Sequence, residues 1–245
     1  VVSRRLGRHG EAGHMGGGNR ITYLHHWTGR DGVRSTLLSH NFYSVLANVP
    51  GVATARVRLF DNRGRCIASN PVSFNPVGHL AVTAPLEGEG SMELDMPVPS
   101  WFPREPGRAA VRFYMLYRSD AGQAAIVHCI EEAPTWRQWL WRWPHRHRPW
   151  ESKRTIDGQG LRRIRVVGVN HAPWTAHQHW VVKGVHSGYS ENVQGRVPSR
   201  GLLALDFTPP HEDDWIVKSG CLSTKNGKPY VWTWYGGAPP SVHHG

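Results

Sequence analysis

Apolar and polar residues alternate with a period of two along most of the chain from about residue 36 onward. The stretch 53–61 shows this most clearly, because Ala55, Val57 and Leu59 point one way while the intervening side chains point the other. A turn-forming Asp-Asn-Arg-Gly sequence follows at 61–64, and a second apolar stretch returns over 66–74. The pattern predicts β-hairpins rather than amphipathic helices.

Similar stretches recur along the chain with turn residues between them, a spacing typical of β-sandwiches. They predict strands over residues 36–49, 53–61, 66–74, 78–86, 91–98, 108–119, 123–133, 161–170, 177–185, 201–207, 215–223 and 230–236. We therefore expect an all-β chain with two antiparallel, Ig-like β-sandwich domains in tandem and less than about 12% helix, far below the usual third.

The regular pattern is interrupted at both ends of the first predicted domain. Residues 1–20 are rich in Gly, Arg and His without periodicity, which predicts a flexible basic arm. The divisions that we predict are the arm at 1–20, a sandwich at 21–135, a Trp/Arg-rich connector at 136–160 and a second sandwich at 161–245. The chain begins at Val1, so either a leader has been removed or the numbering starts inside a longer product.

Two short patterns recur in the two halves of the chain. Trp27-Thr28 followed by residues 39–45 is similar to 174–182, with a small residue, His, an amide, an aromatic residue and β-branched residues in order. Residues 76–82 are similar to 198–205. The recurrence predicts an internal duplication whose second copy lacks a strand or two, or else it is chance similarity between β segments.

Residues 37–65 (LLSHNFYSVLANVPGVATARVRLFDNRGR) and 75–82 (NPVGHLAV) carry a family resemblance. The order of strands and turns in them resembles that of the sensory rhodopsin transducer family, over roughly 36–130 and more faintly over 170–235. The resemblance implies a β-sandwich binding or assembly module, often oligomeric, without enzymatic chemistry. The duplication, the connector and the basic arm depart from that family, so only the fold is carried over.

The net charge of +11 is concentrated in two segments of the chain. Residues 1–34 carry six Arg and two acids, and residues 136–165 carry nine Lys or Arg and two acids. The rest of the chain holds 14 basic and 14 acidic residues. This distribution predicts anionic partners for the two basic segments, such as lipid headgroups, nucleic acid or an acidic protein surface.

The Trp/Arg segment, residues 136–150, holds five Trp and four Arg without any acid. Indoles favour boundaries between polar and apolar surroundings, and guanidiniums pair with anions and stack on rings. Alternatives are that the indoles pack between the two sandwiches, or that the segment binds single-stranded nucleic acid or carbohydrate. The residues that we predict to bind a partner are Trp136, Arg137, Trp139, Trp141, Arg142, Trp143, Arg146, Arg148 and Trp150, with Arg4, Arg5 and Arg8 of the arm.

Histidine pairs suggest metal ligands only weakly. His177 and His179 occupy alternate positions of a predicted strand, so both imidazoles lie on one face. His171 precedes them, and His25-His26 lies in the other half, but no acid or Cys stands at a matching short spacing. The alternative is histidines hydrogen-bonded to backbone, and we expect neither a metal nor another cofactor.

Neither the cysteines nor the acidic residues form a recognisable catalytic or metal-binding motif. Cys66, Cys129 and Cys221 are widely spaced; Cys66 and Cys129 either pair or act as small apolar residues. The acids at 87–95 and 212–214 lie in Gly- and Pro-containing stretches and are expected to face solvent. No sequence signature of a hydrolase, nucleotide-binding loop or zinc protease is present, and we predict that the chain is not an enzyme.

These features predict a non-catalytic accessory or structural subunit that docks on a larger, membrane-associated protein complex, for example a photosynthetic or respiratory one. Its expected partners are the protein subunits of that assembly and an anionic membrane surface, with nucleic acid disfavoured. The expected place is peripheral to a membrane, exported or periplasmic rather than cytoplasmic. The alternative is a carbohydrate- or nucleic-acid-binding module, and the sequence leaves open whether Trp232 and Trp234 line a groove.

Overall fold

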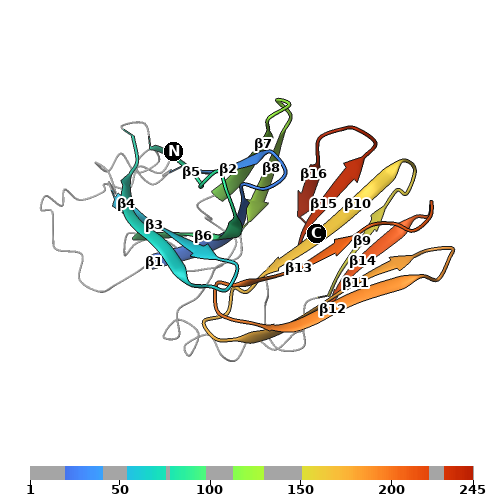
Figure 1. Ribbon diagram of the computed structural model, residues 1–245. Helices are drawn as coiled ribbons and strands as arrows, with labels where there is room; N and C mark the ends of the chain where they lie inside the picture. The colour runs from blue at the N-terminus through green and yellow to red at the C-terminus, as the bar shows by residue number, and fades with distance from the viewer. Residues whose placement is uncertain are drawn as a thin grey trace, which may run out of the picture.

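The computed structural model describes residues 20–40, 54–75, 78–97, 113–129, 151–220 and 229–244. These residues form sixteen β-strands and no helix, so they contain no helix able to cross a membrane. The strands form four four-stranded antiparallel sheets (Figure 1). The prediction of an all-β chain with two antiparallel sandwiches in tandem is confirmed.

The first half of the chain contributes eight of these strands. Its sheet A has the order β1-β6-β3-β4, and its sheet B the order β5-β2-β7-β8. The strands are β1 (Arg20–Thr28), β2 (Val33–His40), β3 (Thr54–Asp61), β4 (Cys66–Ser73), β5 (His79–Thr83), β6 (Glu89–Pro97), β7 (Phe113–Ser119) and β8 (Ala124–Cys129).

The second half contributes the other eight strands. Its sheet C has the order β12-β11-β14-β9, and its sheet D the order β13-β10-β15-β16. The strands are β9 (Glu151–Ile156), β10 (Leu161–Val169), β11 (Ala176–Gly184), β12 (Ser190–Val197), β13 (Leu202–Phe207), β14 (Trp215–Gly220), β15 (Tyr230–Tyr235) and β16 (Ser241–His244).

The two halves repeat one topology. When β1 to β8 are matched in order with β9 to β16, sheet A corresponds to sheet C and sheet B to sheet D, with every neighbour preserved. The predicted duplication of the fold is therefore present. The expectation that the second copy lacks strands is wrong, because β9 and β12, which the sequence analysis missed, complete its sheet C.

The topology supports one of the two recurring patterns and not the other. Residues 76–82 lead into β5 and 198–205 into β13, which are equivalent strands. Residues 174–182 lead into β11, whose equivalent is β3, whereas Ser39 and His40 end β2, whose equivalent is β10. The similarity around the histidines therefore does not follow the duplication.

Two apolar clusters hold the sandwiches together. The second sandwich has its own core between sheets C and D, in which Trp180, Phe207 and Trp215 are buried. The larger cluster fills the first sandwich around Leu37, Met92 and Phe113 and continues into the second half. The members from the second half are Val167, Val169, Tyr230, Trp232 and Val242.

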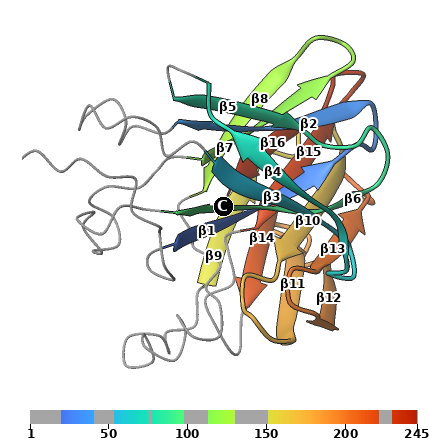
Figure 2. The same cartoon turned by 90° about the vertical axis from the view of Figure 1, so that its left-hand side faces the viewer.

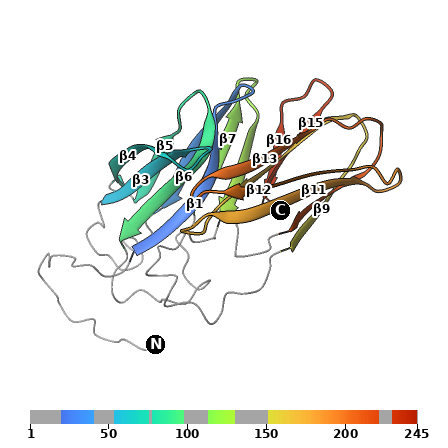
Figure 3. The same cartoon turned by 60° about the horizontal axis from the view of Figure 1, so that its bottom comes forward.

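Sheet D is consequently buried on both faces. Ile164 and Val166 of β10 point into the second core, whereas Val167 and Val169 belong to the cluster shared with the first half. Strand β10 contacts β1, and β16 contacts β8, so sheet D lies against the first sandwich. Figure 1 shows the halves side by side with sheet D between sheet C and the first half, and Figure 3 shows the same arrangement from below. We call the contact between sheet D and the first sandwich the junction.

Several predicted boundaries differ from the observed strands. Residues 151–156, which we assigned to the connector, form β9 and pair with β14 at the edge of sheet C. Strand β1 begins at Arg20, the last residue assigned to the arm, and was not predicted. Residues 1–19 and 130–150 lie outside the described residues.

Candidate functional site: the junction between the sandwiches

Aromatic side chains from both halves meet at the centre of the junction. In sheet D, Arg165 is opposite Trp232 and Val167 is opposite Tyr230, which places these four side chains on the face toward the first half. The Tyr230 hydroxyl lies 3.1 Å from His25 Nδ1, and the Trp232 ring lies 4.8 Å from that of Tyr117 at 77°. These contacts bring strands β1 and β7 against β15.

One group of ion pairs across the junction converges on Glu89. Arg165 Nη2 donates to Glu89 Oε1 at 2.5 Å, and Arg30 Nη1 donates to the same oxygen at 3.0 Å. Arg165 also pairs with Asp206 beside it in sheet D. Arg163 Nη2 donates to Asp206 at 2.6 Å, and its Nη1 reaches Asp31 of the first half at 3.2 Å.

A second group of ion pairs surrounds Glu93, which is 1% exposed. Arg200 Nε donates to Glu93 Oε2 at 2.6 Å, and Arg58 pairs with Oε1. Arg200 Nη1 donates to the His171 carbonyl at 3.1 Å, while its own carbonyl accepts from Ser91 Oγ at 2.6 Å. The turn between β12 and β13 is therefore held on the outer face of sheet A.

Backbone strain coincides with these contacts. Among the described residues, Asp31 and Arg200 are the two non-glycine residues with positive φ, at 55° and 66°. Each reaches an ion-pair partner in the opposite half. Such a conformation costs about 1–3 kcal/mol per residue and persists where surrounding contacts fix it.

Burial and charge set the protonation states at the junction. Burial lowers the pKa of His26, which keeps the imidazole neutral at pH 7. Burial alone would raise the pKa of Glu89, but contacts with His26 and Arg165 outweigh it and hold that pKa at about 2. The pKa of Asp206 is also lowered, because Arg163 and Arg165 outweigh the effect of its burial. Both carboxylates are ionised at neutral pH and stabilise the contact between the halves.

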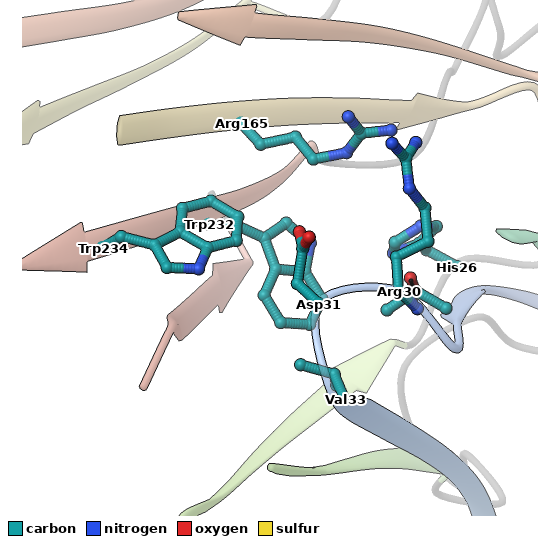
Figure 4. Close-up of a pocket in the computed structure, with 8 residues that line it drawn as sticks. His26, Arg30, Asp31, Val33, Arg165, Trp232 and Trp234 are labelled. Atoms are coloured by element: carbon teal, nitrogen blue, oxygen red, sulfur yellow. Dashed lines mark hydrogen bonds between the residues drawn. The ribbon is translucent and has the colours of Figure 1, made fainter. Parts of the chain in front are cut away.

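A small pocket lies beside the Glu89 ion pairs (Figure 4). Its volume is about 10 Å³, comparable to the space of one water molecule. Arg30 and Arg165 approach each other on one side of it, and Trp232 and Trp234 lie on the other. The guanidinium of Arg163 lies 4.5 Å from the Trp234 ring centroid. Trp232 and Trp234 thus line a pocket too small for an organic ligand.

A larger opening, the junction cleft, lies between the β7–β8 turn and the β15–β16 loop. Its volume is about 110 Å³. The residues that line it are Val33, Tyr117, Ser119, Gln123, Ala124, Ala125, Trp232, Pro240 and Ser241. None of these side chains is charged, so aromatic rings, small apolar groups and neutral hydrogen-bonding groups form the surface.

Trp232, which lines this cleft, also carries a buried donor that no described residue satisfies. Its Nε1 is buried and has no hydrogen-bond partner among the described residues. A buried donor without an acceptor costs about 1–3 kcal/mol, so a ligand or solvent oxygen that reached it would be stabilised. The site therefore suits a neutral ligand that carries hydroxyl groups and an apolar ring face.

Comparisons with known proteins leave the chain without a family assignment. No protein-family model matches it, and no curated protein matches it. A search of solved structures finds the M60 catalytic domain with the CBM51-1 and CBM51-2 domains from Clostridium perfringens ZmpB. That structure has 5% identity and a TM-score of 0.22, with 84% of this chain and 33% of that chain covered.

The search also finds the N-terminal CBM22-1-CBM22-2 tandem domain from Paenibacillus barcinonensis Xyn10C. It has 9% identity and a TM-score of 0.22, with 92% of this chain and 79% of that chain covered. This chain spans about a third of the length of the first structure and most of the second. At these TM-scores neither likeness carries an argument, and the fold is established by the strand pairing itself.

The predicted partner-binding residues are outside the part of the chain that the structure describes. This holds for the whole Trp/Arg segment, from Trp136 to Trp150, and for Arg4, Arg5 and Arg8 of the arm. Docking through these residues stays a prediction.

The two candidate metal ligands lie on the outer face of sheet C. His177 is opposite Arg196, and His179 is opposite Gln194. Among the described residues no group of three or more His, Cys, Asp or Glu is arranged to hold a metal. His25 and His26, considered as further ligands, contact Tyr230 at the junction instead.

The structure corrects the expected exposure of three acids and decides the alternatives left open for Cys66. Glu89 and Glu93 do not face solvent, because β6 presents them to arginines of the second half. Asp213 is also buried, where it accepts hydrogen bonds from the Ser187 hydroxyl at 2.6 Å and from two backbone N–H groups. Cys66 is a free, exposed thiol on β4, so it neither forms a disulfide nor packs as a small apolar residue.

The junction was not predicted as a site from the sequence. Its residues come from strands of both halves of the chain and from the β1–β2 and β12–β13 turns, and no short motif joins them. One available signal was the uninterrupted apolar run at the end of β10, which is typical of a strand buried on both faces.

Proposed function

We propose that this chain is a non-catalytic glycan-binding protein in which the junction cleft holds a neutral sugar. The observation that carries the proposal is the lining of the cleft, in which Tyr117 and Trp232 lie beside Ser119, Gln123 and Ser241. Sugars present apolar C–H faces to aromatic rings and hydroxyl groups to neutral donors and acceptors. The indole N–H of Trp232, which has no partner among the described residues, is a further donor for a sugar oxygen that reaches it.

The rigidity of the junction supports this proposal. Ligand sites are common at contacts between domains, and a preformed site avoids the entropic cost of ordering on binding. The two walls of the cleft belong to different halves, which the shared apolar cluster and the buried ion pairs hold in place. The cleft is thus formed before a ligand arrives.

The proposal is tested by screening the full chain against immobilised neutral oligosaccharides and measuring the affinity of those retained by calorimetry. Trp232→Phe keeps an aromatic ring but removes the N–H, and Gln123→Ala removes an amide from the opposite wall. Each is expected to weaken binding about 3- to 20-fold, corresponding to the loss of one hydrogen bond. Gln159→Ala, an exposed residue of the β9–β10 turn, is the matched control and should bind as the wild type does.

Two results would contradict the proposal. One is the absence of binding to any neutral glycan by a folded protein. The other is binding that is unchanged in both cleft variants, because the sugar would then lie elsewhere.

A second candidate function is the docking of the Trp/Arg segment on a membrane-associated protein complex. The supporting observation is its composition, since Trp and Arg are both enriched in protein interfaces. Replacing Trp139, Trp141 and Trp143 together with Ala should abolish copurification with the membrane fraction while the protein stays folded. Copurification of this variant at the wild-type level would reject docking through the segment.

A further inference from the structure

The outer face of sheet C carries an uncompensated positive charge. In β11, Trp180 and Val182 point into the second core, so Val181 and Lys183 face outward. By the same alternation Lys218 of β14 and Lys153 of β9 face outward. The sheet lies on the side of the second half away from the junction (Figures 1 and 2).

We call this surface the basic face. Its polar side chains are Lys153, Thr155, His177, His179, Lys183, Ser190, Asn192, Gln194, Arg196 and Lys218.

The strand register brings the cations together. Lys153 is directly opposite Lys218 across β9 and β14, and Lys218 is opposite Val181 of β11. Neighbouring strands lie about 4.8 Å apart, so the ammonium groups of Lys153 and Lys218 share one small region. Like charges directly opposite each other in a sheet are destabilising, which an anionic ligand would reverse.

None of these cations is neutralised within the described chain. The side chains of Lys153, Lys183, Arg196 and Lys218 are exposed and have no ion-pair partner among the described residues. The described side chains of the basic face include no carboxylate. The arginines at the junction, by contrast, are paired with carboxylates.

We propose that the basic face binds an acidic polysaccharide. Its charge is complementary to carboxylate or sulfate groups spaced along such a chain. The amides of Asn192 and Gln194 offer both donors and acceptors, which match sugar hydroxyls. This surface is separate from the junction cleft, and the inference does not depend on the cleft binding a sugar.

The described side chains on this face include no Phe, Tyr or Trp, which argues against single-stranded nucleic acid as its ligand. Sites for single strands place aromatic side chains under the bases. The described side chains that point outward from sheet C include no Phe, Tyr or Trp, because Trp180 and Trp215 are buried in the core. The apolar residues on this face, Val181 and Ile216, are only half-buried aliphatic side chains.

The test measures the affinity of the full chain for heparin and for polygalacturonate at low and at moderate salt. Dextran serves as the neutral polymer, and a DNA duplex serves as the alternative polyanion. A triple variant with Lys153, Lys183 and Lys218 replaced by Gln should lose affinity for the acidic polysaccharides about tenfold or more, with a weaker salt dependence. The matched control replaces Arg63, Arg118 and Arg162, three exposed arginines elsewhere, with Gln and has the same net charge. This control should retain affinity within about twofold.

Because the arm and the Trp/Arg segment also carry positive charge, the loss in the triple Lys variant, and not binding alone, is the decisive result. Equal losses in the triple Lys variant and the control would mean that only net charge matters, and would overturn the proposal. Tighter, equally Lys-dependent binding to the DNA duplex would assign the face to nucleic acid instead. Trp232→Phe should leave binding to acidic polysaccharides unchanged, which separates this surface from the cleft.

Discussion

At the residue scale, the charged side chains of β6 define how the halves fit together. Glu89 and Glu93 alternate along β6 with Met92 and Leu94, so the carboxylates leave the first core on the side of the second half. There they meet Arg165 and Arg200. A buried carboxylate is stable only when it is paired, so each glutamate selects an arginine of the other half.

The protonation of Glu89 and His26 should make the protein less stable in acid. The pKa of Glu89 is about 2 in the folded state, below its ordinary 4.5, and that of His26 is below 6.5. Both groups therefore contribute stability that is complete above their ordinary pKa values and is lost as the pH falls. We expect the urea midpoint to fall from about pH 6.5 downward, and more steeply below about 4.5.

The contribution of Glu89 is isolated by comparison with a neighbouring acid. Glu89→Gln should be less stable than the wild type at pH 7 and show a flatter decline below pH 4.5. Glu87→Gln, at an exposed position two residues away, should follow the wild-type curve. If the Glu89 variant declines as steeply as the wild type, the ion pair does not determine the acid sensitivity.

Arg200 should not tolerate replacement by lysine. Its guanidinium bonds Glu93 and the His171 carbonyl at once, and an ammonium group cannot reproduce that planar geometry. We expect Arg200→Lys to lower the free energy of unfolding by about 2–4 kcal/mol, measured by urea denaturation. Arg162→Lys, on an exposed position of β10, should change it by less than about 0.5 kcal/mol.

At the scale of elements, turns from the two halves interlock. The Leu202 N–H donates to the Asn62 carbonyl at 3.0 Å, which joins the β3–β4 turn to the start of β13. Gly64 in that turn has a φ of +74°, and a Cβ there would lie 2.2 Å from the Ser199 oxygen. Only glycine fits this approach, both because of its backbone conformation and because of the space.

Gly64→Ala is expected to loosen the junction. The added methyl group would push the β3–β4 turn away from the β12–β13 turn, and we expect a loss of stability clearly larger than that from the backbone strain alone. Gly122→Ala is the matched control, since its φ is +85° but nothing lies within 4 Å of its Cβ. Thermal unfolding measures the difference, and equal shifts in the two variants would contradict the importance of the contact.

At the scale of the whole molecule, the two sandwiches share one continuous interior. The cluster that fills the first sandwich includes Tyr230 and Trp232 of the second, and each face of sheet D packs against one of the two apolar cores. Separating the halves would expose these rings and break the ion pairs of Glu93 with Arg200 and of Glu89 with Arg165. The junction therefore costs far more to open than an ordinary linker contact between domains.

The halves should consequently unfold together. We expect a single calorimetric transition whose van't Hoff enthalpy equals the calorimetric enthalpy for the full chain, as two-state unfolding requires. Trp232→Ala, which removes the largest ring that the second half contributes to the shared cluster, should lower the transition temperature and bring the two halves closer to independent unfolding. Two resolved transitions in the wild type would show that the junction does not couple the halves.

The sequence alone determined the fold class and most strands, because a strand with one buried face leaves a period of two that can be read directly. It also predicted a duplication of the β-sandwich, although one of the two recurring patterns behind that prediction does not follow the strand order. Strand β1 was missed because residues 22–28 are all buried, one face in the first core and the other at the junction, so the alternation is lost. Strand β12 was missed because it is a polar edge strand with few apolar positions.

The candidate site, in contrast, was decided by the tertiary structure. Glu89, Arg165 and Trp232 are far apart in the sequence, and only the packing of sheet D on the first sandwich brings them together. The basic face likewise arises because β9 pairs with β14, which places Lys153 opposite Lys218. Local pattern specifies which residues form strands, but the energies of buried charge and shared apolar surface depend on partners that are distant in the chain.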